Sequence, residues 1–538
     1  MRALVRAGRL TPLSSMPAPA TRFRVNPGVA LFFTALLFLG VSLFRDYGIS
    51  WDEIPTREFG QMYVAQHIPD IYALEALRAE KGPAWERHGP VFEIVLANIE
   101  RVAALTDIRS VFFVRHFATF LVFMLGVALF YAFCRRRFST GLSLFAAGML
   151  VLTPLFFAHA FYNTKDVPFL TLFVATMFTL CVWLERPSWP IVIGHAVVTS
   201  MLVSTRVLGL LAIGFTVVLT LLRHRDRAAR IRLAVYAVLI TLLLPVFWPV
   251  LRIDYWGVLS QAVLNASSNT LSPRSVMFWG ESISPKQLPW HYIPSWMLVT
   301  IPIPYLVLFA AGVAVVARRT ITGWRDVLQA PRQDVVVVCW FAAPVLMTIV
   351  LHPILYDGWR HLYFVYPALL YLGVCGAEAA WIWGRRWTAD WPERRRTVVA
   401  VAAVALCLAP SVNFMATSHP FEHLYFNKIA GADLATARSR FDFDYWGLSY
   451  RPMLERLVRM DSSAVIKVRV ENYPGVVNSL MLVPSDRRRL QYVQSIEEAD
   501  YFITNFRYPD DPKPATGELF SLRLGPATIA SLFKVPKP

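Results

Sequence analysis

Six polar residues that each lie just outside a long apolar segment have side chains suited to acid–base and phosphate chemistry. They are Asp52, Glu53, Lys165, Asp166, Arg360 and His361. A carboxylate can take a proton from an acceptor hydroxyl group, and Lys or Arg can stabilise the negative charge that builds up on a departing phosphate. Charged side chains so close to hydrocarbon are costly and usually serve a function. The set therefore indicates transfer of a group from a lipid-linked phosphate.

The segments that must position these residues are predicted to be membrane-spanning helices. The chain has 538 residues, is 56% hydrophobic and has a mean hydropathy of +0.46. A span needs about 20 apolar residues, or fewer where the bilayer thins. We therefore expect a polytopic α-helical membrane protein, in which 189–204 and 207–222 are either two spans or one broken element. The eleven expected segments are 27–44, 111–133, 140–160, 167–184, 189–204, 207–222, 231–251, 294–317, 334–351, 362–383 and 397–415.

The distribution of positive charge predicts the orientation of these spans. A net charge of +17 would suit a nucleic-acid-binding protein. The Arg residues, however, cluster in short loops between alternate apolar segments, at 135–137, 223–232, 318–325 and 385–396, as the positive-inside rule describes. We therefore expect a multi-pass membrane protein with a cytoplasmic N-terminus, an extracytoplasmic C-terminus and no nucleic-acid partner. This topology places all six polar residues on the outer face.

The polar segments predict two domains. Residues 1–417 form the transmembrane domain, with long extracytoplasmic loops at 45–110 and 252–293. The first of these loops is expected to contain an amphipathic helix at 56–68. Residues 418–538 form a small soluble extracytoplasmic α/β domain.

Alternation of apolar and polar residues predicts the elements of the second domain. We expect a helix at 451–460, strands at 465–470 and 501–505, and a hairpin of 519–524 with 528–535. The five Cys residues of the chain all lie in or at the ends of apolar segments, which excludes a disulfide framework and a CxxC metal site.

Several short motifs occur in a fixed order along the chain. The Asp52-Glu53 pair follows the first span, Asp166 precedes the fourth span within the segment 163–168, and Arg360-His361 begins a late span. In this order the chain resembles the GT-C glycosyltransferases, and within them glycosyltransferase family 39, which includes protein O-mannosyltransferases and bacterial aminoarabinose transferase-like enzymes. Two further stretches are similar to segments of bacterial members, namely Trp290-His291-Tyr292-Ile293-Pro294 and the segment 441–450.

The resemblance implies roles for the acidic residues. It implies that Asp52 is the catalytic base and that Asp166 is a second catalytic acid, although Asp166 could instead cap the fourth span. Glu53 orients the acceptor, binds a metal or holds neighbouring helices. The three carboxylates would suit Mg²⁺ or Mn²⁺, but members of family 39 generally do not need a metal, so we expect neither metal nor cofactor.

The resemblance also implies residues that bind the substrates. Many members carry a Lys-Pro-Pro segment in the first loop, where this chain has His88-Gly89-Pro90. A His is a weaker phosphate ligand than Lys near neutral pH, so the donor phosphate is expected to depend on Arg360 and Lys165, with His361 and His88 as further ligands. Trp290 and Tyr292 bind the acceptor or sugar, or else belong to an aromatic belt at the membrane surface.

Together the residues and the resemblance predict an integral-membrane, inverting glycosyltransferase that acts on the outer face of a bacterial inner membrane. It would move a hexose or pentose from a polyprenyl phosphate to a hydroxyl of a glycolipid, polysaccharide or protein, with membrane lipids around it. One alternative is a transporter or flippase of lipid-linked sugars, which would carry ionisable residues in mid-span and repeated halves. The residues nearest to that pattern are His195 and Arg206. The other alternative is a non-catalytic binder of lipid-linked sugars, which only turnover would distinguish from the enzyme.

Overall fold

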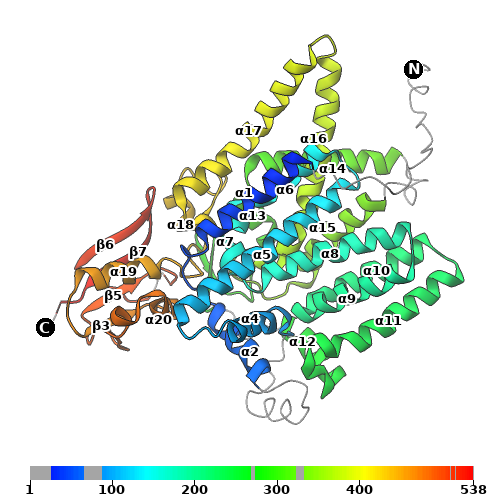
Figure 1. Ribbon diagram of the computed structural model, residues 1–538. Helices are drawn as coiled ribbons and strands as arrows, with labels where there is room; N and C mark the ends of the chain where they lie inside the picture. The colour runs from blue at the N-terminus through cyan, green and yellow to red at the C-terminus, as the bar shows by residue number, and fades with distance from the viewer. Residues whose placement is uncertain are drawn as a thin grey trace.

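A computed structural model of the chain describes residues 26–65, 88–267, 273–322, 332–508, 511–514 and 516–536. The long helices pack side by side, and a small sheet domain lies at one end of the bundle (Figure 1). Some predictions fall outside the described residues: those for the N-terminal segment 1–25, the helix end at 66–68, and the loop portions 66–87, 268–272 and 323–325.

Within the described residues, seven helices are long and apolar enough to cross a membrane. Helices α6 and α7 meet the same criteria only together, and they are bent by 67° at the break between them. Three shorter apolar helices, α1, α9 and α10, occupy the remaining positions. These helices fall on the eleven predicted segments, except that the predicted segment 294–317 is divided between α13 (Tyr292–Thr300) and α14. A multi-pass membrane protein is confirmed. The helices are α1 (Pro27–Leu43), α5 (Ile108–Arg135), α6 (Thr140–Val151), α7 (Pro154–Tyr162), α8 (Asp166–Glu185), α9 (Trp189–Thr205), α10 (Leu210–Arg223), α11 (Arg227–Phe247), α14 (Ile303–Thr322), α15 (Arg332–Leu351), α16 (Tyr366–Trp387) and α17 (Glu393–Ser418).

Local sequence sets where several of these helices begin. The Asn26 side chain accepts the Gly28 N–H at 2.9 Å, and Asp107 likewise accepts the Ser110 N–H at 3.1 Å. Such caps satisfy N–H groups that have no partner within the helix. Pro154 has no N–H and favours the first position of a helix, so the chain starts α7 there and bends away from α6.

The structure decides how the paired segment at 189–222 crosses the bundle. At one end, Arg206, the residue after α9, forms an ion pair with Asp166 at the start of α8. At the other end, His224, the residue after α10, lies 3.0 Å from the carbonyl oxygen of Leu184 near the end of α8. Because α9 ends where α8 begins and α10 ends where α8 ends, the two helices cross separately in opposite directions.

The two ends of the bundle differ in character. The basic loops gather at the end where α5 and α8 finish, since Arg136 pairs with Glu185 at 2.6 Å and Arg137 pairs with Glu378 at 2.8 Å. We call the opposite end, where α8 begins and α9 finishes, the site end.

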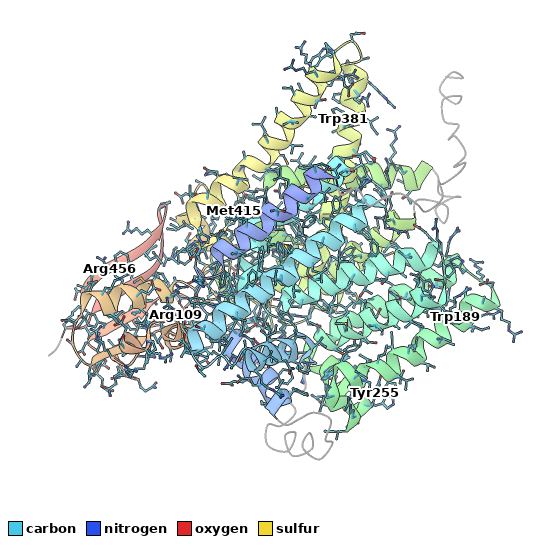
Figure 2. The ribbon with its side chains drawn as sticks, viewed as in Figure 1. Arg109, Trp189, Tyr255, Trp381, Met415 and Arg456 are labelled. Atoms are coloured by element: carbon cyan, nitrogen blue, oxygen red, sulfur yellow. The ribbon has the colours of Figure 1, made fainter. Side chains whose placement is uncertain are left out.

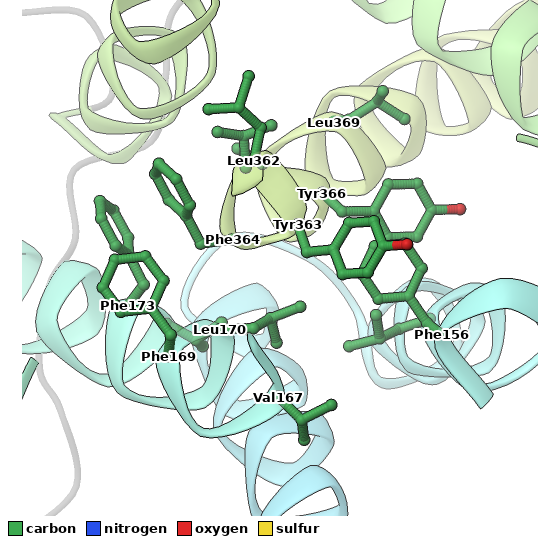
Figure 3. Close-up of a cluster of buried hydrophobic side chains, with 14 of the residues drawn as sticks. Phe156, Val167, Phe169, Leu170, Phe173, Leu362, Tyr363, Phe364, Tyr366 and Leu369 are labelled. Carbon is green, nitrogen blue, oxygen red and sulfur yellow. The ribbon is translucent and has the colours of Figure 1, made fainter. Parts of the chain in front are cut away.

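Aromatic packing fixes the segment that precedes α16, the 3-10 helix η5 (Arg360–Val365), against α8. The Phe364 ring lies 4.4 Å from the ring of Phe173, and Tyr366 stacks on Phe156 of α7 with centroids 4.4 Å apart (Figure 3). Buried aromatic pairs of this kind are worth about 0.5–1.5 kcal/mol beyond their burial. This packing places the first residue of η5, Arg360, at the site end.

Shorter elements cover the site end. The first loop contributes α2 (Glu53–Ala65) and α4 (Val91–Val102), and the buried rings of Phe59 and Tyr63 pack against Ile94 and Ile253. The other elements are η2 (Val207–Gly209), η3 (Pro249–Arg252), α12 (Tyr255–Ser267), β1 (Val276–Phe278), β2 (Glu281–Ile283), α13 (Tyr292–Thr300), η6 (Glu422–Leu424) and α18 (Leu434–Arg440).

The C-terminal domain contains a five-stranded mixed sheet with strand order β4-β3-β5-β7-β6. Strand β3 pairs in parallel with β4 and β5, whereas β7 is antiparallel to β5 and β6. The predicted helix, strands and terminal hairpin are confirmed, and the predicted domain boundary at 417/418 stays a prediction. The elements are α19 (Tyr450–Met460), β3 (Ile466–Val470), α20 (Pro474–Val477), η7 (Asn478–Met481), α21 (Pro484–Arg487), β4 (Leu490–Tyr492), β5 (Tyr501–Thr504), β6 (Glu518–Leu524) and β7 (Ala527–Lys534).

Candidate functional site

An ion pair between Asp52 and Arg360 lies at the centre of the site end. The Asp52 carboxylate accepts a hydrogen bond from the Arg360 guanidinium at 2.7 Å. Arg360 is buried, with 6% of its side chain exposed, whereas 33% of the Asp52 side chain is exposed. Asp52 is therefore held by a fixed cation and still open to an incoming molecule.

The environment of Asp52 keeps it ionised. Burial raises the pKa of the Asp52 carboxyl, but the positive charges of Arg360 and Lys165 more than offset that effect, so the pKa lies below its ordinary value of 3.8. On its other side, the Arg360 guanidinium lies 5.0 Å from the ring centroids of both Tyr356 and Trp446. The Trp446 indole N–H donates to His159 at 3.2 Å, which fixes this ring beneath the cation.

Asp166 belongs to a second acidic position beside the first. The side chain of Asn163 accepts the Asp166 backbone N–H at 2.8 Å and donates to the Asp166 carboxylate at 2.9 Å. The other oxygen of Asp166 pairs with Arg206. Asp166 is thus a buried carboxylate at the start of α8 that holds Arg206 in place.

Lys165 supplies a further cation beside these ion pairs. Within the described residues, no hydrogen bond or ion pair involves its ammonium group. Burial, together with the charge of Arg206, lowers the pKa of Lys165 to about 8. Lys165 thus adds a positive charge beside the Asp52–Arg360 and Asp166–Arg206 ion pairs. A cation that is not taken up by a carboxylate among the described residues suits an anionic ligand.

Glu53 lies next to Asp52 but faces away into the protein. Its carboxylate accepts the Ser50 N–H at 2.6 Å and pairs with His116 of α5 at 2.9 Å. The residue is 1% exposed. These contacts favour the interpretation in which Glu53 holds the loop that carries Asp52 to a neighbouring helix.

The two predicted histidines lie near the cations. Gly89 donates its N–H to the Ser204 carbonyl at 2.5 Å, and a Cβ on Gly89 would lie 2.7 Å from that oxygen. This close approach brings His88 toward the end of α9, where burial and the charges of Lys165 and Arg206 hold the pKa of His88 well below its usual value. The protonated form of His88 is therefore disfavoured. The ring of His361 lies 5.1 Å from that of Tyr356, and its buried Nδ1 has no hydrogen-bond partner among the described residues.

The structure places neither Trp290 nor Tyr292 against the Asp52–Arg360 pair, although Tyr292 lies close enough to Asp357 and Arg507 to interact electrostatically with both. Trp290 is 60% exposed and borders a shallow hollow with Lys286 and His352. Tyr292 is buried, with its ring 5.0 Å from that of Phe278. Across the described residues, no hydrogen bond, ion pair or ring contact links either side chain to Asp52 or Arg360.

Sequence reasoning missed four residues that contribute to the site. Arg206 could have been found from the sequence, because it is an ionisable residue between two short apolar segments. Asp357 pairs with Arg360 at 3.1 Å and also with Arg507 at 2.7 Å. Trp446 lies in a segment that the resemblance had singled out, whereas Arg507 follows β5 of the C-terminal domain and carried no signal.

The described residues contain no cluster of three or more His, Cys, Asp or Glu side chains that could hold a metal ion. The metal ligation considered for Asp52, Glu53 and Asp166 therefore has no cluster among these residues, since each carboxylate is occupied by a cation or a backbone group. Absence of a metal requirement stays a prediction.

Comparisons with known proteins address the fold. A family model described as dolichyl-phosphate-mannose-protein mannosyltransferase matches residues 88–253. A crystal structure of ArnT from Cupriavidus metallidurans bound to undecaprenyl phosphate superposes with a TM-score of 0.50 at 13% identity, covering 94% of this chain and 98% of that one. The chain has the ArnT fold.

A second solved structure is less similar. An oligosaccharyltransferase from Archaeoglobus fulgidus, tethered to an acceptor peptide, superposes with a TM-score of 0.49 at 11% identity, covering 86% of this chain and 63% of that one. A search of curated protein sequences finds no match. The predicted resemblance to GT-C glycosyltransferases is confirmed, by the family model over 88–253 and by the ArnT fold over most of the chain.

Proposed function

We propose that the protein is an integral-membrane, inverting glycosyltransferase that takes a sugar from a polyprenyl phosphate. The observation that carries the proposal is the partly exposed Asp52 carboxylate, held against Arg360 with Lys165 and Arg206 close by. The reaction needs a base for the acceptor and cations for the departing phosphate. The ArnT fold supports the choice of donor, because the similar ArnT structure holds undecaprenyl phosphate.

In the proposed reaction, Asp52 accepts the proton of the acceptor hydroxyl as its oxygen attacks the anomeric carbon. The bond from that carbon to the phosphate oxygen breaks, and the electron pair goes to the phosphate. Attack on the face opposite the phosphate inverts the anomeric centre, and Arg360, Lys165 and Arg206 stabilise the charge on the leaving group. A phosphate that draws Arg360 toward itself removes positive charge from Asp52 and so makes the carboxylate a stronger base.

The proposal includes a location. The site end is the end opposite the basic loops, and the positive-inside rule puts those loops in the cytoplasm. The reaction then takes place on the outer face of a bacterial inner membrane. The acceptor is a hydroxyl of a glycolipid, polysaccharide or protein, and the transferred sugar is a hexose or pentose.

The transporter hypothesis depended on two ionisable residues, and the structure gives each another explanation. His195 is buried and shares hydrogen bonds with Thr179 at 2.7 Å and Thr216 at 2.8 Å, as a core histidine does. Arg206 belongs to the site end through Asp166. No observation therefore favours a second function.

The test is release of free lipid phosphate from a panel of polyprenyl-phosphate sugars, with envelope lipids and glycans supplied as acceptors. The Asp52→Asn variant should lose about 10²- to 10⁴-fold in turnover, the usual contribution of a general base, while it still binds undecaprenyl phosphate. Asp390→Asn, in an exposed turn after α16, is the matched control and should be fully active. Normal turnover in the Asp52 variant would refute its role as the base.

A further inference from the structure

The C-terminal domain docks directly on the elements that carry Asp52. An apolar cluster of Ile49, Phe112, Val477 and Met481 is buried between the first loop, the start of α5, and α20 with η7 of the domain. Figure 2 shows Arg109, at the start of α5, close to the domain whose helix α19 carries Arg456. The domain is therefore packed against the site end.

Within this contact, the side chain of Asn478 forms two hydrogen bonds with the backbone of Ile49. Its oxygen accepts the Ile49 N–H at 2.9 Å, and its NH₂ group donates to the Ile49 carbonyl at 2.9 Å. The amide is fully buried, and a Cβ on Gly48 would clash with it, so only glycine permits the approach. Ile49 precedes Asp52 by three residues, so this double hydrogen bond fixes where the loop presents the carboxylate.

A second residue of the domain, Arg507, acts on Arg360 through Asp357. The Arg507 guanidinium, with 5% of its side chain exposed, pairs with Asp357 at 2.7 Å and with Asp442 at 3.0 Å. The other carboxylate oxygen of Asp357 pairs with Arg360 at 3.1 Å. Asp357 has φ of 55°, a backbone conformation that non-glycine residues rarely adopt and that persists only where its surroundings enforce it. Arg507 thus holds Asp357, and Asp357 orients Arg360 toward Asp52.

We propose that the C-terminal domain positions both members of the Asp52–Arg360 pair, Asn478 through Ile49 and Arg507 through Asp357. Neither Asn478 nor Arg507 is a catalytic residue, since each acts through another side chain or the backbone. The kinetic part of this inference rests on the proposed glycosyltransferase function. The structural part, that the domain sets the geometry of the loop and of Arg360, does not.

Because the two positioning residues act on different members of the pair, their substitutions should cause different kinetic defects. Asn478→Ala should displace the base and lower kcat by about 10- to 100-fold, because a misplacement of about 1 Å can cost 10²-fold, with donor KM little changed. Arg507→Met should free Asp357 and loosen Arg360, raising the donor KM and the Kd for undecaprenyl phosphate by about tenfold. The milder Asn478→Ser, whose hydroxyl can still donate or accept one of these hydrogen bonds, and Arg507→Lys should recover part of each loss. They serve as the test variants if the stronger ones fail to fold.

The control separates positioning from simple loss of domain stability. Arg489 donates to the carbonyl oxygens of Val458 at 2.9 Å and Ser463 at 2.9 Å inside the domain. Arg489→Met should therefore lower the melting temperature without changing kcat selectively, as Asn478→Ala does, or donor KM selectively, as Arg507→Met does. Asn98→Ala and Arg523→Ala, at exposed positions, should change neither property.

Hydrogen exchange of residues 46–53 gives a readout independent of activity. Exchange should rise in Asn478→Ala and stay at the wild-type rate in Arg507→Met. The proposal would be overturned if both variants changed kcat and donor KM in the same way as Arg489→Met does at the same melting temperature. Unchanged exchange in Asn478→Ala would overturn it as well. Failure of the wild-type protein to release lipid phosphate from any donor would refute the proposed function instead, while exchange and undecaprenyl phosphate binding would still decide the positioning.

Discussion

Replacing Arg360 by Ala tests the electrostatic basis of the site most directly. The change removes a buried guanidinium that contacts Asp52 at 2.7 Å and Asp357 at 3.1 Å. Breaking a buried ion pair costs about 3–5 kcal/mol. We expect about 2–3 kcal/mol of destabilisation here, toward or below the low end of that range, because Asp52 is one-third exposed and Asp357 keeps Arg507.

Binding of the lipid phosphate should weaken more specifically. A hydrogen bond to a charged group contributes about 1.5–3 kcal/mol, which corresponds to a loss of about 10- to 150-fold in affinity. The assay is calorimetric titration of the purified protein with undecaprenyl phosphate in detergent, and the same samples give the melting temperature. Arg360→Lys should fall between wild type and Arg360→Ala, because an ammonium keeps the charge but not the two-sided contact.

A matched control checks that the effect is local. Arg274 pairs with Asp511, and 74% of its side chain is exposed. Arg274→Ala should leave both affinity and stability within error of wild type, since exposed ion pairs contribute about 0–1 kcal/mol. Wild-type affinity in folded Arg360→Ala would remove Arg360 from the donor site and refute the reasoning.

Three further predictions concern the neighbouring residues. Because burial lowers the pKa of Lys165 to about 8, its ammonium loses a proton as the pH rises through that value, so undecaprenyl phosphate affinity should fall between pH 7 and 9, and Lys165→Met should abolish that fall. Arg206→Ala should weaken the same binding about tenfold, and an unchanged titration would place Arg206 outside the phosphate site. Glu53→Gln should reduce turnover by less than about tenfold, far less than Asp52→Asn, because Gln can still accept the Ser50 N–H; equal losses would make Glu53 a reacting group.

Much of the secondary structure was predictable because it depends on short stretches of sequence. The strands, the helix and the hairpin of the C-terminal domain occur where alternation predicted them. The hairpin turns at Gly525, which has φ of 56° and permits the tight connection between β6 and β7. The number of crossings at 189–222 was harder to predict, because its two segments are short. Only the contacts of Arg206 and His224 with the ends of α8 show that there are two crossings and not one.

The individual site residues were predictable only in part. Residue type and position near a span singled out Asp52, Lys165 and Arg360, because a charge beside hydrocarbon is costly wherever it occurs. Arg507 could not be found in this way, since it lies in a polar domain where an arginine is unremarkable. Its importance comes from Asp357, which it reaches across 150 positions of the chain.

The sequence by itself determined the membrane helices and the common end of the bundle at which the charged residues lie, since apolar length and loop charge are local properties. The tertiary structure decided which carboxylate meets which cation. Asp52 and Arg360 are 308 positions apart, and they meet because aromatic packing seats η5 on α8 while the C-terminal domain holds the first loop. Such pairing depends on how whole elements pack, so residue type and spacing do not contain it.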